Sequence, residues 1–343
     1  MNQLLNTLYV TTEPGYLRLD HDTVRVEVDG DTRLQVPLHH LGAIVCFGDI
    51  MITPALIRRC SEEGRSLVYL DRHGRFVARV EGPVSGNVLL RRAQHLASTD
   101  AEWTARIARN IVAGKIQNAR QVILRAAREA DGTDDAQVLS EVAKEQAATL
   151  ARLPNAASLD QIRGLEGEAA RAYFGTFDRM VRGDREAFGM KGRNRRPPLD
   201  RVNALLSFLY TLLLHDCIAA AEGTGLDPQV GFLHALRSGR PALGLDLMEE
   251  LRAVLADRLS LTLINRKQVT RKDFVERPGG AIQFTDAARK KVVIAYQKRK
   301  QDEVEHEVAN QKVPLGLVPH IQARLLARHL RKDLDEYPPF LYR

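Results

Sequence analysis

Residues 81–87 read EGPVSGN, and the character of the chain changes at this stretch. Glycine, proline, serine and asparagine favour turns, so such a run predicts a connection between two structural units. Before it, Val24, Val26 and Val28 alternate with charged residues, which is the pattern of a strand with one buried face. After it, strand patterns nearly vanish and helical patterns take over. The sequence therefore predicts an α+β protein in which a β-rich domain precedes a larger all-α domain.

The β-rich domain is expected to cover residues 1–84, residues 85–100 to hold the linker and the start of the first helix, and residues 101–343 to form the helical domain. One helix interrupts the predicted strands, because Thr53 and Pro54 make a favourable helix start and Gly64 a favourable stop. Besides the valine-rich strand, strands are expected at 17–19, 34–36, 43–47, 66–70 and 76–80, with His73 and Gly74 as the hairpin turn between the last two.

Seven segments after residue 87 carry apolar residues at helical spacing and are rich in alanine, leucine, arginine and glutamate. Two short stretches, 261–265 and 280–284, have strand patterns instead and predict a small hairpin inside the helical domain. The helices are expected over 88–113, 115–131, 136–152, 166–181, 200–222, 246–256 and 285–309.

The composition is that of a soluble globular protein, with 44% hydrophobic and 27% charged residues among 343. Its 50 lysines and arginines against 43 acids give a net charge of +7, which makes an anionic partner plausible. The three cysteines show no C-x-x-C spacing, so neither a disulfide framework nor a zinc knuckle is predicted. We expect a cytoplasmic protein without a signal peptide or a membrane span, since even the apolar run 204–214 is short.

The first stretch that suggests chemistry is RGLEGEAARAYF at 163–174, where a helix is predicted to open with Gly167 directly after Glu166. Glycine costs a helix interior about 0.8–1.0 kcal/mol relative to alanine. Its presence suggests that another helix, the ligand sphere of a metal or a phosphate approaches the backbone closely. The alternative is that Glu166 is a first-turn acid that complements the helix dipole.

The second stretch combines GFLH at 231–234 with a predicted helix that carries Asp246, Glu249 and Glu250 on one face. Carboxylates gathered on one face repel one another unless a cation lies among them. An imidazole beside carboxylates is a mixed nitrogen and oxygen ligand set that suits Mn²⁺, Mg²⁺ or Zn²⁺. The alternatives are a solvated acidic face and, for His234, a histidine that is satisfied within the core.

A competing pair, His215-Asp216, follows the apolar run and superficially matches the adjacent pair of metal-dependent phosphohydrolases. Such sites need further histidines from other helices. His215 is better explained as a polar residue at the end of a buried helix.

Three clusters of basic residues are candidate contacts for a polyanion. The first, within 182–201, is also rich in glycine and proline and is expected to be a mobile loop whose cations hold phosphates beside the acidic site. The third is followed directly by acids at 302–307, so a solvated face of paired charges explains it better. The clusters comprise Arg182, Arg185, Lys191, Arg193, Arg195, Arg196 and Arg201; Arg266, Lys267, Arg271 and Lys272; and Arg289, Lys290, Lys291, Lys298, Arg299 and Lys300.

In order and spacing, these stretches together resemble the CRISPR-associated integrase family. Its members are known as the first numbered Cas protein. The resemblance runs through most of the chain. It rests on RGLEGEAARAYF at 163–174, RRPPLDRVNALLSFLY at 195–210, GFLH at 231–234, and DLME at 246–249 with Arg252. A β-rich start before a helical lobe is also similar to that family, which dimerises through its N-terminal domains. The resemblance thus implies a dimerisation domain over 1–84 and a catalytic domain over 101–343.

Carried over position by position, the resemblance implies that Glu166, His234 and Glu249 are metal ligands. Many members have aspartate at the last position, so whether Glu249 or Asp246 makes the closer contact stays open. Asn203 and Tyr210 are implied to lie on a helix near the site. DNA contacts are expected from Arg163, Arg171, Arg182, Arg193, Arg195, Arg196, Arg252, Arg266 and Lys267.

The family implies a metal-dependent DNA endonuclease and integrase with Mg²⁺ or Mn²⁺ as its cofactor. Such an enzyme inserts short DNA fragments into a CRISPR array by attack of a 3′-hydroxyl on a phosphodiester in double-stranded or branched DNA. The family also implies a homodimer that works with a small partner, the second numbered Cas protein, in a prokaryotic cytoplasm. Two alternatives stay open: a non-enzymatic, basic helical DNA-binding protein, and a metal phosphohydrolase that uses His215 and Asp216.

Overall fold

The structure is a computed structural model that describes residues 7–72, 76–80, 82, 88–190, 192–194 and 197–342. The chain divides into two compact units. The first takes its described residues from 7–82 and 289–301, and the second from 88–288 and 302–342. The first is rich in strands and the second is mainly helical, which confirms the predicted α+β class.

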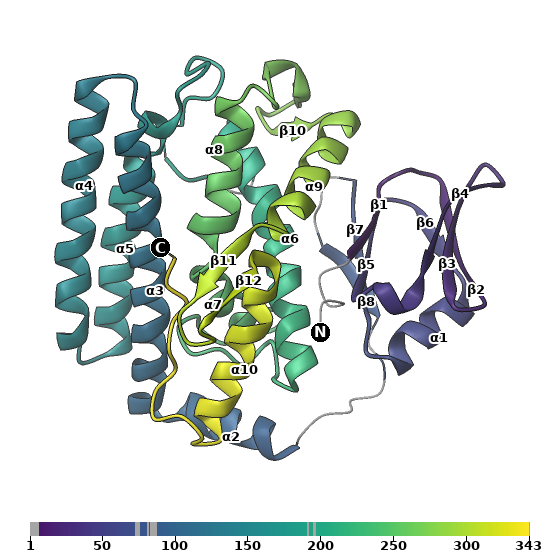
Figure 1. Cartoon of the computed structure of the whole chain (residues 1–343), viewed down its shortest axis with the longest axis horizontal. Coiled ribbons are helices and arrows are strands. Elements are labelled where there is room, and N and C mark those ends of the chain that lie inside the picture. Colours follow the sequence, from purple (N-terminus) through teal and green to yellow (C-terminus); the bar gives the residue numbers. More distant parts are fainter. Residues whose placement is uncertain are drawn as a thin grey trace. The chain divides into compact units, whose positions relative to one another are not determined.

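Two four-stranded sheets build the first unit (Figure 1). In one sheet, with strand order β4-β3-β2-β6, neighbours are antiparallel except for the parallel pair β2 and β6. In the other, with order β1-β5-β7-β8, only β7 and β8 are antiparallel. The strands are β1 (Thr7–Val10), β2 (Gly15–Asp20), β3 (Thr23–Val28), β4 (Asp31–Pro37), β5 (Ala43–Phe47), β6 (Ile50–Ile52), β7 (Ser66–Leu70) and β8 (Phe76–Val80).

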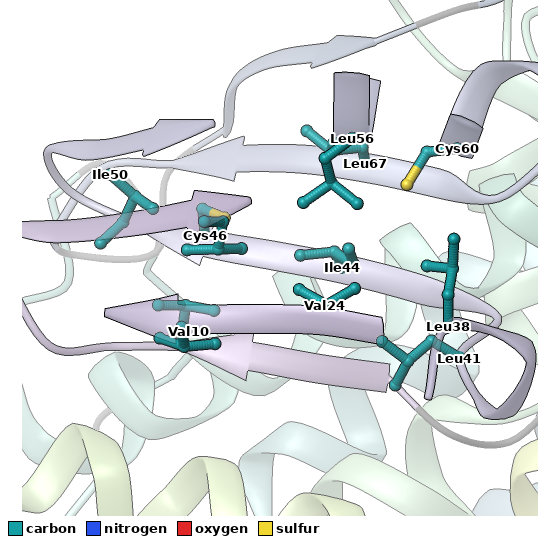
Figure 2. Close-up of a cluster of buried hydrophobic side chains, with 12 residues drawn as sticks. Val10, Val24, Leu38, Leu41, Ile44, Cys46, Ile50, Leu56, Cys60 and Leu67 are labelled. Carbon is teal, nitrogen blue, oxygen red and sulfur yellow. The ribbon is translucent and has the colours of Figure 1, made fainter. Parts of the chain in front are cut away.

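The alternation that predicted β3 is obeyed, because Val24, Val26 and Val28 are buried and the residues between them are less so. Val24 meets Ile44 from the other sheet in a common apolar core (Figure 2). Helix α1 (Pro54–Glu62) adds Leu56 and Cys60 to this core. The helix begins after Thr53 and ends before Gly64, as predicted. The turn expected at His73 and Gly74 lies outside the described residues.

One helix from late in the chain belongs to the first unit. Helix α9 (Asp286–Lys300) contributes residues 289–300 to it. The ammonium group of Lys290 donates a hydrogen bond to the hydroxyl of Thr12 at 3.0 Å. Arg289 and Lys300 are only 4% and 3% exposed, so these two residues are not part of a solvated face.

Helices α3, α4 and α5 run side by side in the second unit (Figure 1). The turn after α7 is π-helical over Arg252–Asp257. Two short hairpins complete the unit, β9 with β10 and β11 with β12. The elements are α2 (Val88–Thr99), α3 (Ala101–Arg128), α4 (Thr133–Arg152), α5 (Leu159–Gly175), α6 (Arg201–Thr224), α7 (Ala242–Glu249), α8 (Arg258–Asn265), β9 (Phe274–Glu276), β10 (Ile282–Phe284), β11 (Glu303–His306), β12 (Gln311–Pro314) and α10 (Val318–Leu330).

Two helix boundaries differ from the prediction because capping residues were overlooked. The predicted break at residue 114 lies at Asp100, whose carboxylate accepts the first amide N–H groups of α3 from Glu102 and Trp103. Helix α5 begins after Ser158, whose hydroxyl accepts the N–H of Gln161, and not at residue 166. Glu166 therefore lies in the interior of α5, and its interpretation as a first-turn acid is wrong.

Two further predictions fail where short segments carry mixed patterns, and one helix was missed. Residues 261–265 belong to helix α8, so the partner of β10 is β9. The helix expected over 285–309 ends at Lys300, because strand β11 follows it. Helix α10 was not predicted.

Helix α6 extends beyond the apolar run at 204–214 on both sides. Among the described residues it is the one helix long and apolar enough to cross a membrane by length and composition. However, 61% of its most apolar window is buried inside the protein, which is the environment of a core helix. Asp200 caps its start by accepting the N–H of Asn203 at 2.7 Å, and Gly225 ends it in the left-handed conformation.

Candidate active site

Asp246 on helix α7 organises the loop that carries the predicted histidine. Its side chain is fully buried and accepts the backbone N–H groups of Phe232, Leu233 and His234 at 2.6, 3.0 and 3.0 Å. The imidazole Nδ1 of His234 also lies 2.7 Å from Asp246 Oδ1. Because a carboxylate can only accept, Nδ1 is the donor of this pair, and Nε2 points toward Glu249. Asp246 thus fixes both the path of the loop and the orientation of the imidazole.

Gly231 is required by the same contact. A Cβ atom built on it would lie 2.7 Å from the Asp246 carboxylate oxygen Oδ2 and 2.7 Å from the carbonyl carbon of Ala242. Real Cβ atoms do not come so close to other heavy atoms. The glycine of the GFLH stretch therefore lets the loop approach α7 closely enough to bind the carboxylate.

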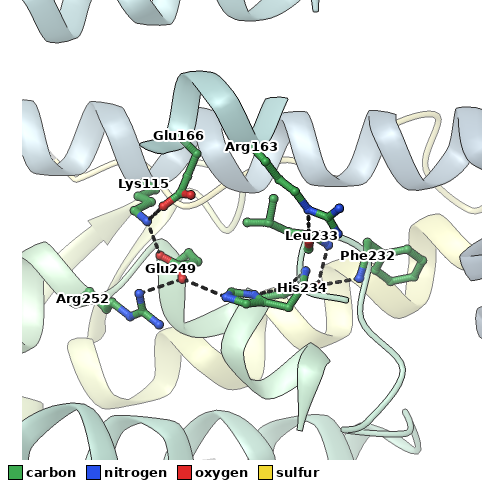
Figure 3. A network of polar contacts seen from close by, with 9 residues as sticks. Lys115, Arg163, Glu166, Phe232, Leu233, His234, Glu249 and Arg252 are labelled. Carbon is green, nitrogen blue, oxygen red and sulfur yellow. Dashed lines mark hydrogen bonds and ion pairs between the residues drawn. The ribbon is translucent and has the colours of Figure 1, made fainter. Parts of the chain in front are cut away.

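Glu249 lies at the centre of a cluster of charges (Figure 3). Its side chain is 2% exposed, and its Oε2 atom is 2.8 Å from the Nζ atom of Lys115. Its Oε1 atom is 2.8 Å from Arg252 Nη1 and 3.6 Å from His234 Nε2. Burial alone would raise the pKa of Glu249, but the charges of Arg252, Lys115 and His234 lower it to about 2. Glu249 is therefore an anion at neutral pH.

Glu166 joins the cluster from helix α5. Its carboxylate contacts the ammonium group of Lys115, which thus pairs with Glu166 and Glu249 at once. Three stretches that lie far apart in the sequence are thereby brought together, as predicted. Of the three neighbours expected at Gly167, another helix is excluded, because no described atom from elsewhere lies within 4 Å of a Cβ built on it.

A second polar cluster, formed by Tyr173, Tyr210 and Asp257, lies beside the charged cluster around Glu249. The hydroxyls of Tyr210 and Tyr173 donate to the two carboxylate oxygens of Asp257 at 2.7 and 3.0 Å. Burial raises the pKa of Asp257 to about 6, although these hydrogen bonds oppose the change. The guanidinium carbons of Arg193 and Arg252 each lie 5.2 Å from the centroid of the Tyr210 ring.

A cavity of about 40 Å³ connects the two groups. That volume exceeds the roughly 10–15 Å³ that one water molecule needs. Its polar lining comes from both groups, so the charged cluster and the tyrosine pair share one pocket. The polar side chains that line it are Lys115, Gln146, Tyr173, Tyr210, Glu249, Arg252 and Asp257.

Asn203 and Tyr210 both lie on α6, and both contact arginines. The guanidinium of Arg193 donates to the side-chain oxygen of Asn203 at 2.5 Å and to the hydroxyl of Ser207 at 3.1 Å. The described part of the predicted mobile loop is thus tied to α6. Asn203 itself is fully buried.

The remaining predicted DNA contacts that the structure describes divide into two kinds, one that contacts the protein and one that is exposed. Arg163 points to the protein, because its guanidinium donates to the carbonyl of Leu233 at 2.7 and 2.9 Å and so supports the loop before His234. Arg195 and Arg196 lie outside the described residues. The exposed members are Arg171, Arg182, Arg266 and Lys267.

The acidic face predicted on α7 is not solvated. Asp246, Glu249 and Glu250 are at most 2% exposed, and they do not act together. Glu250 turns toward the C-terminal segment, where it accepts hydrogen bonds from Tyr337 and from the N–H of Phe340, each at 2.7 Å. Burial raises the pKa of Glu250 to about 8 despite these donors.

The sequence did not single out Lys115, which lies on α3 and pairs with Glu166 and Glu249. A single lysine on an amphipathic helix has no distinguishing pattern, and only the packing of α3 against α5 and α7 identifies it. The competing pair His215-Asp216 lies within helix α6, and not at its end as expected. The described part of the chain gathers no group of three or more candidate metal ligands, either at this pair or around Glu249.

A family model and individual relatives both match this chain, and they belong to the same family. The model of the family described as CRISPR associated protein Cas1 matches residues 8–298. A relative from Moorella thermoacetica, named CRISPR-associated endonuclease Cas1 1, is 66% identical over 343 residues that cover all of both chains.

Solved structures share the fold at lower identity. A casposase bound to an integration product is 20% identical with a TM-score of 0.83, covering 97% of this chain and 92% of that one. A chain of a Cas6-RT-Cas1–Cas2 complex is 23% identical with a TM-score of 0.83, covering 98% of this chain and 36% of that one. At these identities the likeness concerns the fold alone.

The contact at Gly231 predicts a loss of stability when a methyl group is added. We expect Gly231→Ala to lower the free energy of unfolding by about 1–3 kcal/mol, because overpacking at a closed contact costs this much. Chemical denaturation measures the change. Gly164→Ala is the matched control, since open space at this helical position should make the protein equally stable or about 1 kcal/mol more stable. Equal effects of the two substitutions would contradict the assigned contact.

The raised pKa of Asp257 predicts a stability that falls as pH rises. The folded protein holds the Asp257 proton up to about pH 6, whereas the ordinary value is 3.8. The stabilisation is therefore complete below pH 4 and is lost as pH rises through 6, with a size of about 3 kcal/mol at most. Asp257→Asn should reduce this dependence between pH 4 and 6 in denaturation experiments, and the part that remains up to pH 8 belongs to Glu250, whose pKa is raised to about 8. Exposed Asp131→Asn should leave it unchanged.

Proposed function

Because the chain belongs to the CRISPR associated protein Cas1 family, we propose that it is a metal-dependent DNA endonuclease and integrase. The carrying observation is that Glu166, His234 and Glu249 converge on one partly buried cluster although they lie on three separate segments. Its 66% identical relative bears the name of an endonuclease, which supports the same class of reaction.

The residues of this cluster fit a divalent metal ion. The ammonium of Lys115 marks a place between two carboxylates where the fold already accommodates positive charge. The Oε2 atom of Glu249 pairs with this ammonium at 2.8 Å, and the Nε2 atom of His234 lies 3.6 Å from Oε1 of the same carboxylate. As the side chains lie, the described residues do not present three ligands around one point, so the ammonium of Lys115 has to withdraw.

Glu249 is the better candidate than Asp246 for direct metal contact. Asp246 already accepts three backbone N–H groups and the imidazole N–H, so its lone pairs are committed. A carboxylate behind a ligating histidine holds the ring in place and raises its basicity. Asp246 is accordingly proposed to orient His234, while Glu166, His234 and Glu249 hold Mg²⁺ or Mn²⁺.

The proposed reaction is a transesterification. The 3′-hydroxyl of the incoming DNA fragment gives its proton to water as its oxygen forms a bond to phosphorus. The bond from phosphorus to the departing 3′-oxygen breaks, this oxygen takes up a proton from water, and the number of phosphodiesters is unchanged. When bound, the divalent ion supplies charge stabilisation at the reacting phosphate. Arg252 and Arg193 hold neighbouring phosphate oxygens, and the stacked Tyr210 keeps their guanidinium groups in position.

The proposal includes partners and location. The substrate is double-stranded or branched DNA, which the exposed basic residues Arg171, Arg182, Arg266 and Lys267 contact through phosphates. The first unit makes a homodimer, and the dimer works with the second numbered Cas protein in a prokaryotic cytoplasm. A protein of the same fold belongs to a Cas6-RT-Cas1–Cas2 complex, which agrees with such an assembly.

Removing the charge of Glu166 tests the proposal. Glu166→Gln keeps the shape of the side chain, and we expect strand transfer into branched DNA with Mn²⁺ or Mg²⁺ to fall about 10–100-fold or more. Glu168→Gln is the matched control on the same helix, because this half-exposed acid pairs with Arg152 outside the cluster. DNA binding in chelator should survive both changes. Unchanged strand transfer in Glu166→Gln would favour a non-enzymatic DNA-binding protein instead.

Lys115 should compete with the metal for the carboxylates. We expect Lys115→Met to tighten Mn²⁺ binding by about tenfold in calorimetry without DNA, an effect of about 1.4 kcal/mol. The same variant should be less stable in chelator, since Glu166 and Glu249 lose their shared cation. Lys115→Arg keeps the charge and should bind Mn²⁺ nearly as the parent does. Weaker Mn²⁺ binding by the Met variant would contradict the assignment.

A further inference from the structure

The final described residues lie along helix α3 (Figure 1). Three side chains on one face of α3 each donate a hydrogen bond to a backbone carbonyl group of this segment. Arg106 reaches the carbonyl of Asp335 at 2.9 Å, Asn110 that of Tyr337 at 2.9 Å, and Asn118 that of Phe340 at 2.8 Å. Residues four apart share a helix face, so the stripe binds the segment at regular intervals.

Gly114 completes this stripe between Asn110 and Asn118. A Cβ atom there would lie 3.0 Å from the Cβ of Pro339 and 3.1 Å from the Cγ of Glu250. The glycine therefore lets the final segment and Glu250 both lie against the backbone of α3. This contact also explains why the glycine is tolerated inside a long helix.

Glu250 is held by the same segment. The hydroxyl of Tyr337 donates to its Oε1 at 2.7 Å, and the N–H of Phe340 donates to its Oε2 at 2.7 Å. Gln322 on α10 adds a donor at 2.9 Å. Asn118 binds the backbone carbonyl of Glu250 at 2.7 Å, so side chain and main chain are both fixed. These donors are neutral, and they surround a fully buried carboxyl group.

We propose that residues 337–342, the C-terminal latch, are a positioning element for the candidate metal site. The latch contacts Gly114 and Glu250, and the next residues in the chain from these two are Lys115 and Glu249. It therefore fixes the backbone on both sides of the charged cluster without contacting a ligand. This inference rests on the proposed function, because its main consequence is the affinity for the metal.

Variants of the latch test this role in the full-length protein. Tyr337→Phe removes one donor, and Glu250→Leu leaves the donors without an acceptor, so both should weaken Mn²⁺ binding by about tenfold in calorimetry. Glu250→Gln should bind Mn²⁺ nearly as the parent does, because an amide can accept from Phe340 and Gln322 while the Tyr337 hydroxyl turns to accept. Hydrogen exchange should rise at residues 246–257 in the two damaging variants only.

A control separates positioning from general destabilisation. Leu139 is fully buried on α4 away from the latch, and Leu139→Val should lower the melting temperature without changing the Mn²⁺ affinity. Parent-like Mn²⁺ affinity and exchange in Tyr337→Phe and Glu250→Leu would overturn the latch. If the parent itself binds no Mn²⁺, the proposed function fails, and the exchange at 246–257 still decides whether the latch holds α7.

Discussion

The candidate site depends on the carboxylate of Asp246. A buried carboxylate is expensive unless its oxygens are satisfied, and here four hydrogen bonds from residues 232–234 satisfy them. The loop has no helix or strand of its own over these residues, so the carboxylate supplies the order that regular structure would otherwise give. Because one group binds both the loop backbone and the imidazole, this side chain ties His234 to α7, while Arg163 holds the carbonyl of Leu233 from α5. Gly231 makes that approach sterically possible.

The charges around Glu249 come from several elements that no local pattern connects. Lys115 comes from α3, Glu166 from α5 and Arg252 from the π-helical turn, and His234 lies on the loop held by Asp246 (Figure 3). Burying one carboxylate among two cations and an imidazole is favourable only while all of them are in place. The charged cluster is therefore stable only when the elements of the helical unit pack as they do here.

Periodic and capped segments could be read from the sequence, whereas long-range partners could not. Alternating valines gave β3, and Thr53 with Pro54 gave α1, because those patterns are local. Glu166, His234, Asp246 and Glu249 were identified by family motifs, and the structure brings them together. Lys115 and the C-terminal partners of Glu250 were not predicted, because their role arises from contacts between elements that lie far apart in the sequence. The break wrongly placed at Gly114 has the same cause, since the glycine serves a tertiary contact within a continuous helix.

Two adjacent glutamates show why burial alone does not determine a charge state. Glu249 and Glu250 are equally hidden from solvent, yet the pKa of the first is about 2 and that of the second about 8. Desolvation acts on both, but only Glu249 faces the cations of Arg252 and Lys115. Glu250 faces a hydroxyl, an amide side chain and a backbone N–H, which compensate desolvation only partly. Glu249 is thereby an anion suited to hold a cation, and Glu250 ties the same helix to the C-terminal segment.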